Sequence, residues 1–247
     1  MERTREQHTL LVSILLHLVP GVLATILFVL LEGPVVAFGF PPIAAFLAAI
    51  ALVVIPFELG LLLWLGRNRN GGLSLDGVVL YREPMRGRDW AWLYPVLLLA
   101  AFLGFGILAV IEPALRSALF GWLPSWFLTL IDFDAIRTYS ANAWLITLAA
   151  YFVLNVFAGP ITEELYFRGY LLPRIDRFGR WAPLINVTLF SLYHLWSPWQ
   201  ILARIAGVGP FAYAVWWKRN IYLGMAVHVS LNLIATTIVA VTVTSRL

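Results

Sequence analysis

Long apolar runs recur along the whole chain, and they limit what it can fold into more than any other feature. A helix needs about 20 apolar residues to cross the hydrocarbon core of a bilayer. Because backbone groups in lipid must bond internally, such runs predict an all-α transmembrane helix bundle. The seven predicted spans are residues 9–31, 43–66, 91–111, 143–172, 181–197, 199–217 and 220–244. A re-entrant segment around residues 35–42 would raise the number of membrane segments to eight.

The composition agrees with a lipid environment. Hydrophobic residues make up 61% of the chain and charged residues only 12%, about half the share of a soluble domain. The absence of cysteine excludes disulfide bonds and cysteine-based metal sites. The first run follows Arg3 and Arg5, as the core of a signal peptide would. It is too long for that role and lacks a small-residue cleavage site, so we expect a retained span.

The basic residues predict a topology. They could suggest a nucleic-acid partner, but they lie in short loops between apolar runs, so we expect the lipid bilayer as partner and no nucleic acid. Twelve of the 17 basic residues fall before the first run or in loops on the same side of the membrane. Three fall on the other side. The positive-inside rule therefore predicts a cytoplasmic N-terminal segment.

Two stretches between the runs are not spans. Residues 67–90 are polar and contain five arginines, whereas residues 112–142 mix tryptophans with acidic residues. The second pattern is typical of an interfacial helix and loop. We therefore expect one membrane domain in which residues 1–142 supply N-terminal spans and interfacial segments. Residues 143–247 supply the helices that carry most of the buried ionisable groups.

Ionisable side chains within a span are costly and indicate function or pairing. The fourth predicted span contains Glu163, Glu164 and Arg168, the fifth contains His194, and the seventh contains His228 and Asn232. Glu164 and Arg168 share a helix face and can pair, whereas Glu163 points roughly 100° away. Glu163, His194 and His228 lie roughly 12 to 20 Å from the cytoplasmic side, so we expect them to meet in one site.

These residue types suggest hydrolysis of an acyl bond in one of two ways. A glutamate can act as general base toward water that a histidine helps to hold, while a second histidine and an amide stabilise the oxyanion. Alternatively, one carboxylate and two imidazoles are a ligand set for catalytic zinc, with Glu163, His194 and His228 as the metal ligands. The residues alone leave both open.

The residues also match three motifs of a known family. Residues 163–168 (EELYFR) resemble EExxxR, residues 190–194 (FSLYH) resemble FxxxH, and residues 228–232 (HVSLN) resemble HxxxN. These are the motifs of the CAAX-processing and bacteriocin-processing (CPBP, or Abi) intramembrane endopeptidases, and their order also fits. The resemblance covers residues 140–240, and the first 140 residues remain unmatched.

The resemblance implies a role for each motif residue. Glu163 would be the principal base, and Glu164 would pair with Arg168 to hold the motif. His194 would help to activate water, and His228 and Asn232 would stabilise the oxyanion. It also implies an integral protein of a prokaryotic cell membrane. Its substrate would be membrane-embedded or lipidated: a prenylated CAAX-type C-terminal peptide, a bacteriocin leader or a membrane-anchored regulator. A requirement for zinc stays open.

Other interpretations stand beside this one. The Glu164–Arg168 pair could be structural only, and membrane histidines often bond neighbouring helices. A silent protein of the same fold could act as a scaffold or a bacteriocin-immunity protein. A proton-coupled transporter also uses buried glutamate and histidine, but the sequence shows no inverted repeat. His17 and Arg204 are expected to be bundle or near-interface residues, and Glu58 has no evident partner.

Overall fold

The computed structural model describes residues 6–247, which form a bundle of helices. Within this range five helical stretches are long and apolar enough to cross a membrane. They are α1 (Leu10–Ala37), α2 to α3 (Pro42–Asn70), α4 (Gly87–Ala109), α7 to α9 (Ala141–Tyr193) and α11 (Ile221–Thr244). The predicted all-α transmembrane fold is confirmed. Arg3 and Arg5 lie outside the described residues, and the cytoplasmic placement of this segment stays a prediction.

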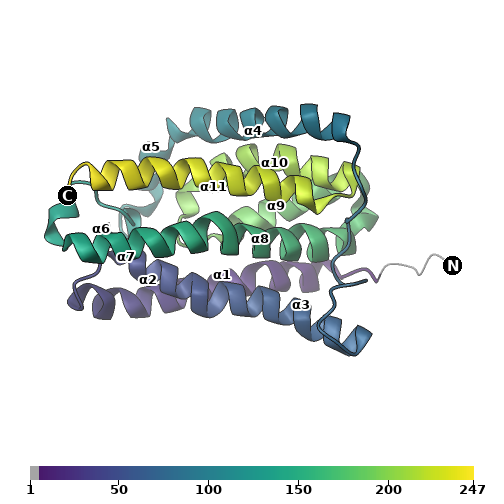
Figure 1. The fold of residues 1–247 in the computed structure, drawn as a ribbon, viewed down its shortest axis with the longest axis horizontal. Helices are drawn as coiled ribbons and strands as arrows, with labels where there is room; N and C mark the ends of the chain where they lie inside the picture. Colours follow the sequence, from purple (N-terminus) through teal and green to yellow (C-terminus); the bar gives the residue numbers. More distant parts are fainter. Residues whose placement is uncertain (1–5) are drawn as a thin grey trace.

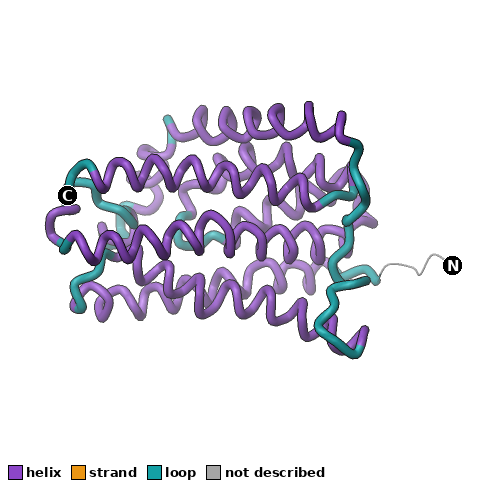
Figure 2. The backbone as a smooth tube through the Cα atoms, viewed as in Figure 1, coloured by secondary structure: helices purple, strands orange, loops and turns teal. Residues whose placement is uncertain are grey.

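The shorter elements separate or extend these stretches. In chain order they are α2 (Pro42–Ala49), η1 (Ile50–Val54), α3 (Ile55–Asn70), α5 (Glu112–Phe120), α6 (Ser125–Leu128), η2 (Ile136–Thr138), α7 (Ala141–Tyr151), η3 (Phe152–Ala158), α8 (Gly159–Glu163), η4 (Glu164–Leu171), η5 (Leu172–Trp181), α9 (Ala182–Tyr193), η6 (Pro198–Gln200) and α10 (Ile201–Lys218). Helices α1 to α3 lie along one side of the bundle and α4 along the other, with the remaining long helices between them (Figure 1). The loops gather mainly at the two ends (Figure 2).

The observed helices differ from the predicted spans in three places. Spans 143–172 and 181–197 lie in one helical stretch, which turns at Gly179, where φ is +54°. Span 199–217 corresponds to α10, which is not among the five stretches. Residues 35–42 hold the turn between α1 and α2 and form no re-entrant segment. A total of seven to eight spans therefore stays a prediction.

A polar side chain caps the N-terminus of three of the helices. The side-chain oxygens of Thr9, Ser140 and Asn220 accept hydrogen bonds from backbone N–H groups at the starts of α1, α7 and α11. Such caps satisfy donors that the first helical turn leaves free. They define where each apolar segment enters the bundle.

Helix α9 stops inside the bundle. Its 12 residues rise only about 18 Å, which is less than the roughly 30 Å core of a bilayer. The chain then turns at residues 194–200 and returns through α10. This turn lies short of the bundle end that α1, α7 and α11 reach (Figure 1). Helix α5 packs against this turn at η6.

The other end of the bundle is closed by a strap, residues 71–86, which crosses it. Backbone bonds join the Leu80 N–H to the Gly169 carbonyl over 2.7 Å and the Ile221 N–H to the Tyr81 carbonyl over 2.8 Å. The strap therefore links η4 to the start of α11. We call this the arginine-rich end, because it gathers Arg67, Arg69, Arg82, Arg86, Arg88, Arg174, Arg177, Arg180, Lys218 and Arg219.

Candidate active site

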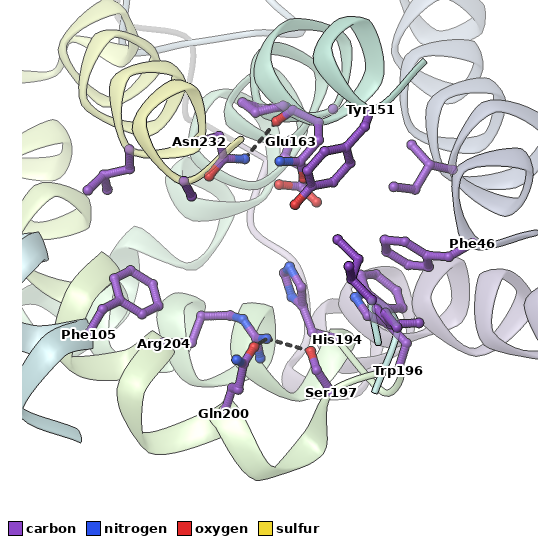
Figure 3. A pocket seen from close by; sticks show the side chains of 18 of the residues that line it. Phe46, Phe105, Tyr151, Glu163, His194, Trp196, Ser197, Gln200, Arg204 and Asn232 are labelled. Atoms are coloured by element: carbon purple, nitrogen blue, oxygen red, sulfur yellow. Dashed lines mark hydrogen bonds between the residues drawn. The ribbon is translucent and has the colours of Figure 1, made fainter. Parts of the chain in front are cut away.

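A cavity of about 600 Å³ lies between the α9–α10 turn and the end of the bundle opposite the arginine-rich end. Glu163, His194, His228 and Asn232 all line it, and Figure 3 shows the side chains of Glu163, His194 and Asn232 around it. Part of its wall comes from residues 112–133, which we call the roof. The roof comprises α5, α6 and the loops that follow them. The structure thus brings residues from all three motifs to one cavity.

Glu163 is the last residue of α8 and has a π-helical segment on each side, η3 before it and η4 after it. Its carboxyl group is mostly buried but reaches the cavity. One oxygen lies 3.8 Å from Nε2 of His228. The other accepts a hydrogen bond of 3.4 Å from the Tyr193 hydroxyl. One carboxylate oxygen of Glu163 therefore faces His228, and the other is held by the Tyr193 hydroxyl.

His228 is held by the second glutamate. Its Nδ1 lies 3.0 Å from Oε1 of Glu164, and the same oxygen lies 3.2 Å from Nη1 of Arg168. Glu164 and Arg168 are fully buried and do not line the cavity. A Cβ atom at Gly224 would lie 2.7 Å from the other Glu164 oxygen, so only glycine lets α11 come this close. Glu164 thus orients His228 from behind, while Nε2 faces Glu163.

Arg168 forms the predicted ion pair with Glu164, but its nitrogen atoms have no aligned hydrogen-bond partner. The two side chains therefore attract each other by charge, without an aligned hydrogen bond. The guanidinium carbon lies 4.1 Å from the ring centre of Phe190 and 5.6 Å from that of Phe211. Such cation–π contacts stabilise a desolvated cation. Phe190, the first residue of the second motif, contributes the ring face that Arg168 contacts.

His194 follows α9 directly and has left the helical conformation, with ψ at 58°. Its Nδ1 lies 2.8 Å from the Phe190 carbonyl, which makes Nδ1 the donor and leaves Nε2 free to accept. Arg204 supports this helix end by donating to the Ser191 carbonyl over 3.3 Å and to the Ser197 hydroxyl over 2.7 Å. A cation at a helix C-terminus is favourable, so the bundle role expected for Arg204 fits its contacts.

Asn232 bonds to the helix that carries Glu163. In η3 the Gly159 N–H reaches the Leu154 carbonyl, five residues back. Pro160 has no N–H to continue this pattern to the Asn155 carbonyl. The amide nitrogen of Asn232 donates to that carbonyl over 2.7 Å, as Figure 3 shows. The Asn155 carbonyl, which the proline leaves without a helical donor, is therefore satisfied by the third motif.

The zinc alternative needs Glu163, His194 and His228 to converge on one point. Among residues 6–247 no three His, Cys, Asp or Glu side chains are gathered closely enough to hold a metal ion. Glu163 and His228 face each other, but Nδ1 of His228 points to Glu164, and Nδ1 of His194 points to the Phe190 carbonyl. As placed, these three residues do not form a tetrahedral ligand set. A zinc requirement remains a prediction that metal removal tests.

A scan of family models gives one match. Residues 142–234, which include all three motifs, match the model described as Type II CAAX prenyl endopeptidase Rce1-like. This match confirms the resemblance to the CAAX-processing family. It supports a CAAX-type intramembrane endopeptidase in general terms. No curated protein and no solved structure matches significantly. The division at residue 142 stays a prediction, although the match begins there.

Sequence reasoning missed Tyr193, which lies in the second motif next to His194. Its hydroxyl is the donor to Glu163, and its side chain is fully buried. The available signal was a phenol beside the motif histidine in an apolar helix, where a buried hydroxyl needs a partner. No partner for Glu58 is evident from the sequence. It is fully buried, and its α3 helix packs against α8 and η4.

Proposed function

We propose that this chain is an intramembrane endopeptidase that hydrolyses a peptide bond of a membrane-associated substrate with water activated at Glu163. The observation that carries the proposal is the position of Glu163. Its carboxyl group reaches a cavity inside an apolar bundle and lies 3.8 Å from His228, within the segment that matches the family. A buried carboxyl beside a histidine is suited to general base catalysis.

The reaction needs only the groups around the cavity and one water molecule. Glu163 takes a proton from water, and the oxygen attacks the carbonyl carbon of the scissile bond. When the carbon–nitrogen bond breaks, the Glu163 carboxyl group returns this proton to the leaving amine. Nε2 of His194, free because Nδ1 donates to the Phe190 carbonyl, accepts a hydrogen bond from the attacking water.

We assign stabilisation of the oxyanion to two groups, His228 and Asn232. His228 lies between Glu163 and Glu164, and an imidazolium there has one N–H for Glu164 and another for the oxyanion. The Asn232 amide uses one N–H for the Asn155 carbonyl and keeps a second for the cavity. Each such donor contributes about 10²- to 10³-fold to catalysis.

The cavity wall favours a lipidated or apolar peptide. Aromatic rings from separate elements line it beside the polar groups, including Phe46, Phe105, Trp196 and Trp199. An apolar wall with a few convergent polar groups is typical of a site for a mostly hydrophobic ligand. We therefore place a farnesylated CAAX-type peptide first among the candidate substrates, ahead of an unmodified leader peptide or a membrane-anchored regulator.

The test is cleavage of quenched fluorescent peptides by the purified protein in detergent. The panel holds one farnesylated CAAX peptide, its unprenylated counterpart and a set of apolar leader-like peptides. We expect cleavage of the farnesylated peptide by the wild type and loss of cleavage in Glu163→Gln and His228→Ala. Folding of each variant is checked by thermal unfolding, so that a loss of activity is not mistaken for a loss of structure.

A zinc chelator separates the two chemical alternatives. Activity that survives the chelator supports glutamate-activated water without metal, and activity restored only by added zinc supports metal assistance. If the folded wild type cleaves nothing in the panel, the proposal fails for these substrate classes. The silent scaffold or immunity protein of the same fold then becomes the better account.

A further inference from the structure

Glu58 is a buried acid that the proposed reaction does not use. It lies on α3, outside the segment that matches the family, and is fully buried. Neither of its carboxyl oxygens has an aligned hydrogen-bond partner among the described residues. An isolated carboxyl in an apolar bundle is costly, so its presence needs a reason.

Tyr193 connects this acid to the site. Its hydroxyl donates to Glu163 over 3.4 Å, and the Glu58 carboxyl group interacts with the same hydroxyl. The Tyr193 ring is packed against Phe167 and Trp196, with ring centres 5.0 and 5.3 Å away. The hydroxyl is therefore fixed between two carboxyl groups that come from helices far apart in the sequence.

We propose that Glu58 and Tyr193 are positioning residues for Glu163. Burial of Glu58 costs less free energy when the carboxyl group is neutral. The neutral acid donates a hydrogen bond to the phenolic oxygen of Tyr193, and the phenolic O–H donates to Glu163. These two hydrogen bonds in series hold the Glu163 carboxylate against His228 at the cavity. This inference rests on the proposed function, because it takes Glu163 as the base. It also gives the N-terminal half of the chain a part in the site.

Three variants separate the parts of this arrangement. Tyr193→Phe keeps the ring and removes the hydroxyl. Glu58→Gln keeps a hydrogen-bond donor, whereas Glu58→Leu removes it. The matched control is Tyr213→Phe, because the Tyr213 hydroxyl donates over 3.0 Å to the Arg180 carbonyl at the arginine-rich end.

Kinetics on the peptide that the wild type cleaves give the first readout. We expect kcat to fall about 10- to 100-fold in Tyr193→Phe and Glu58→Leu, with KM changed less than about twofold, because the lost bond acts on a charged group. Glu58→Gln should keep kcat within about threefold of the wild type. The Tyr193→Phe, Glu58→Leu double variant should be no slower than the slower single variant, since both remove one connected unit. A purely structural role would lower the thermal unfolding temperature and leave the kcat of the folded fraction unchanged.

A second readout does not depend on activity. A protonated carboxyl group has an infrared carbonyl band separate from the carboxylate bands. We expect a buried band that is present in the wild type and in Glu163→Gln, absent in Glu58→Gln and shifted in Tyr193→Phe. This measurement tests the inference even if no peptide is cleaved and the proposed function fails.

The outcomes are distinct. If Glu163→Gln is inactive while Tyr193→Phe and Glu58→Leu both match the wild type, the proposed function stands and this inference is overturned. Additive losses in the double variant, or an infrared band that neither Glu58→Gln nor Tyr193→Phe changes, overturn it as well.

Discussion

The two ends of the bundle are built differently. At the arginine-rich end the strap is bonded to its neighbours and ion pairs join separate elements: Lys218 pairs with Asp89 at 3.0 Å and Arg219 with Asp176 at 2.9 Å. Toward the other end, the helices leave a cavity of about 600 Å³ under a roof of short helices and loop.

This difference assigns separate tasks to the two ends. The strap joins η4 to the start of α11, and these two elements carry Glu164 and His228. The closed end thus fixes how the motif helices meet, while the cavity end leaves room for a substrate. We expect changes near the cavity to alter the reaction and changes at the closed end to alter mainly stability.

The largest expected effect is at Glu163. Glu163→Gln removes the base and should lower kcat by about 10²- to 10⁴-fold, with unfolding little changed. The matched control is Glu83→Gln, which removes an exposed carboxylate from the strap and should leave kcat unchanged. Comparable losses in both variants, measured by peptide cleavage, would remove the distinction between the two ends.

The next effect is on stability behind the cavity. Arg168→Leu leaves Glu164 without its buried cation and should lower the free energy of unfolding by about 3–5 kcal/mol. The exposed Arg177→Leu is the control and should change it by no more than about 0.5 kcal/mol. Denaturant unfolding in detergent measures both. An Arg168 variant as stable as the control would show that the pair does not hold the motif.

A smaller effect is expected at the roof. The chain has no cysteine, so a single introduced thiol can be labelled selectively. A bulky maleimide on Thr129→Cys, which lines the cavity, should lower cleavage on the order of tenfold, or ~1.4 kcal/mol. The same label on Ser74→Cys in the strap should have no effect. Equal inhibition at both positions would mean that substrate binding does not depend on access to the cavity beside the roof.

The smallest effect is at the closed end. Asp176→Asn removes the ion pair with Arg219 and should cost about 1 kcal/mol of unfolding free energy, because the pair is only partly buried. The kcat of the folded fraction should stay within about twofold of the wild type. A selective fall in kcat, with stability unchanged, would instead link the closed end to the reaction.

Much of this architecture could be predicted from the sequence. Apolar length predicted the helical stretches, because crossing lipid allows few alternatives. The spacing of four residues predicted the Glu164–Arg168 pair, which is present at 3.2 Å. The gathering of Glu163 and His228 followed from their similar depth. The catalytic roles assigned to these residues stay predictions.

Other parts could not be predicted. The 3.6-residue period does not reveal π-helical segments, so the bond from Asn232 to the Asn155 carbonyl was not foreseen. Apolar content suggested a full span at residues 181–197, but α9 ends at Tyr193, where the chain leaves helical geometry. Glu58 and Tyr193 come together because α3 and α9 both pack against η4. Such packing between segments far apart in the sequence leaves no local sequence pattern.

The π-helical segment before Glu163 has a consequence for how this sequence can change by insertion or deletion. A π-helical turn holds one more residue than an α-helical turn, and such segments occur often at functional sites. Deleting one residue within 152–158 can therefore be absorbed by a return to α geometry, which keeps Glu163 close to its orientation relative to the residues before η3, whereas the same deletion in an α-helical segment would rotate the residues after it by roughly 100°. Every motif letter would remain in place, yet the backbone carbonyls of η3, including the Asn155 carbonyl that Asn232 binds, would be paired differently. Among relatives, chain length in this segment is therefore as informative as the motifs themselves.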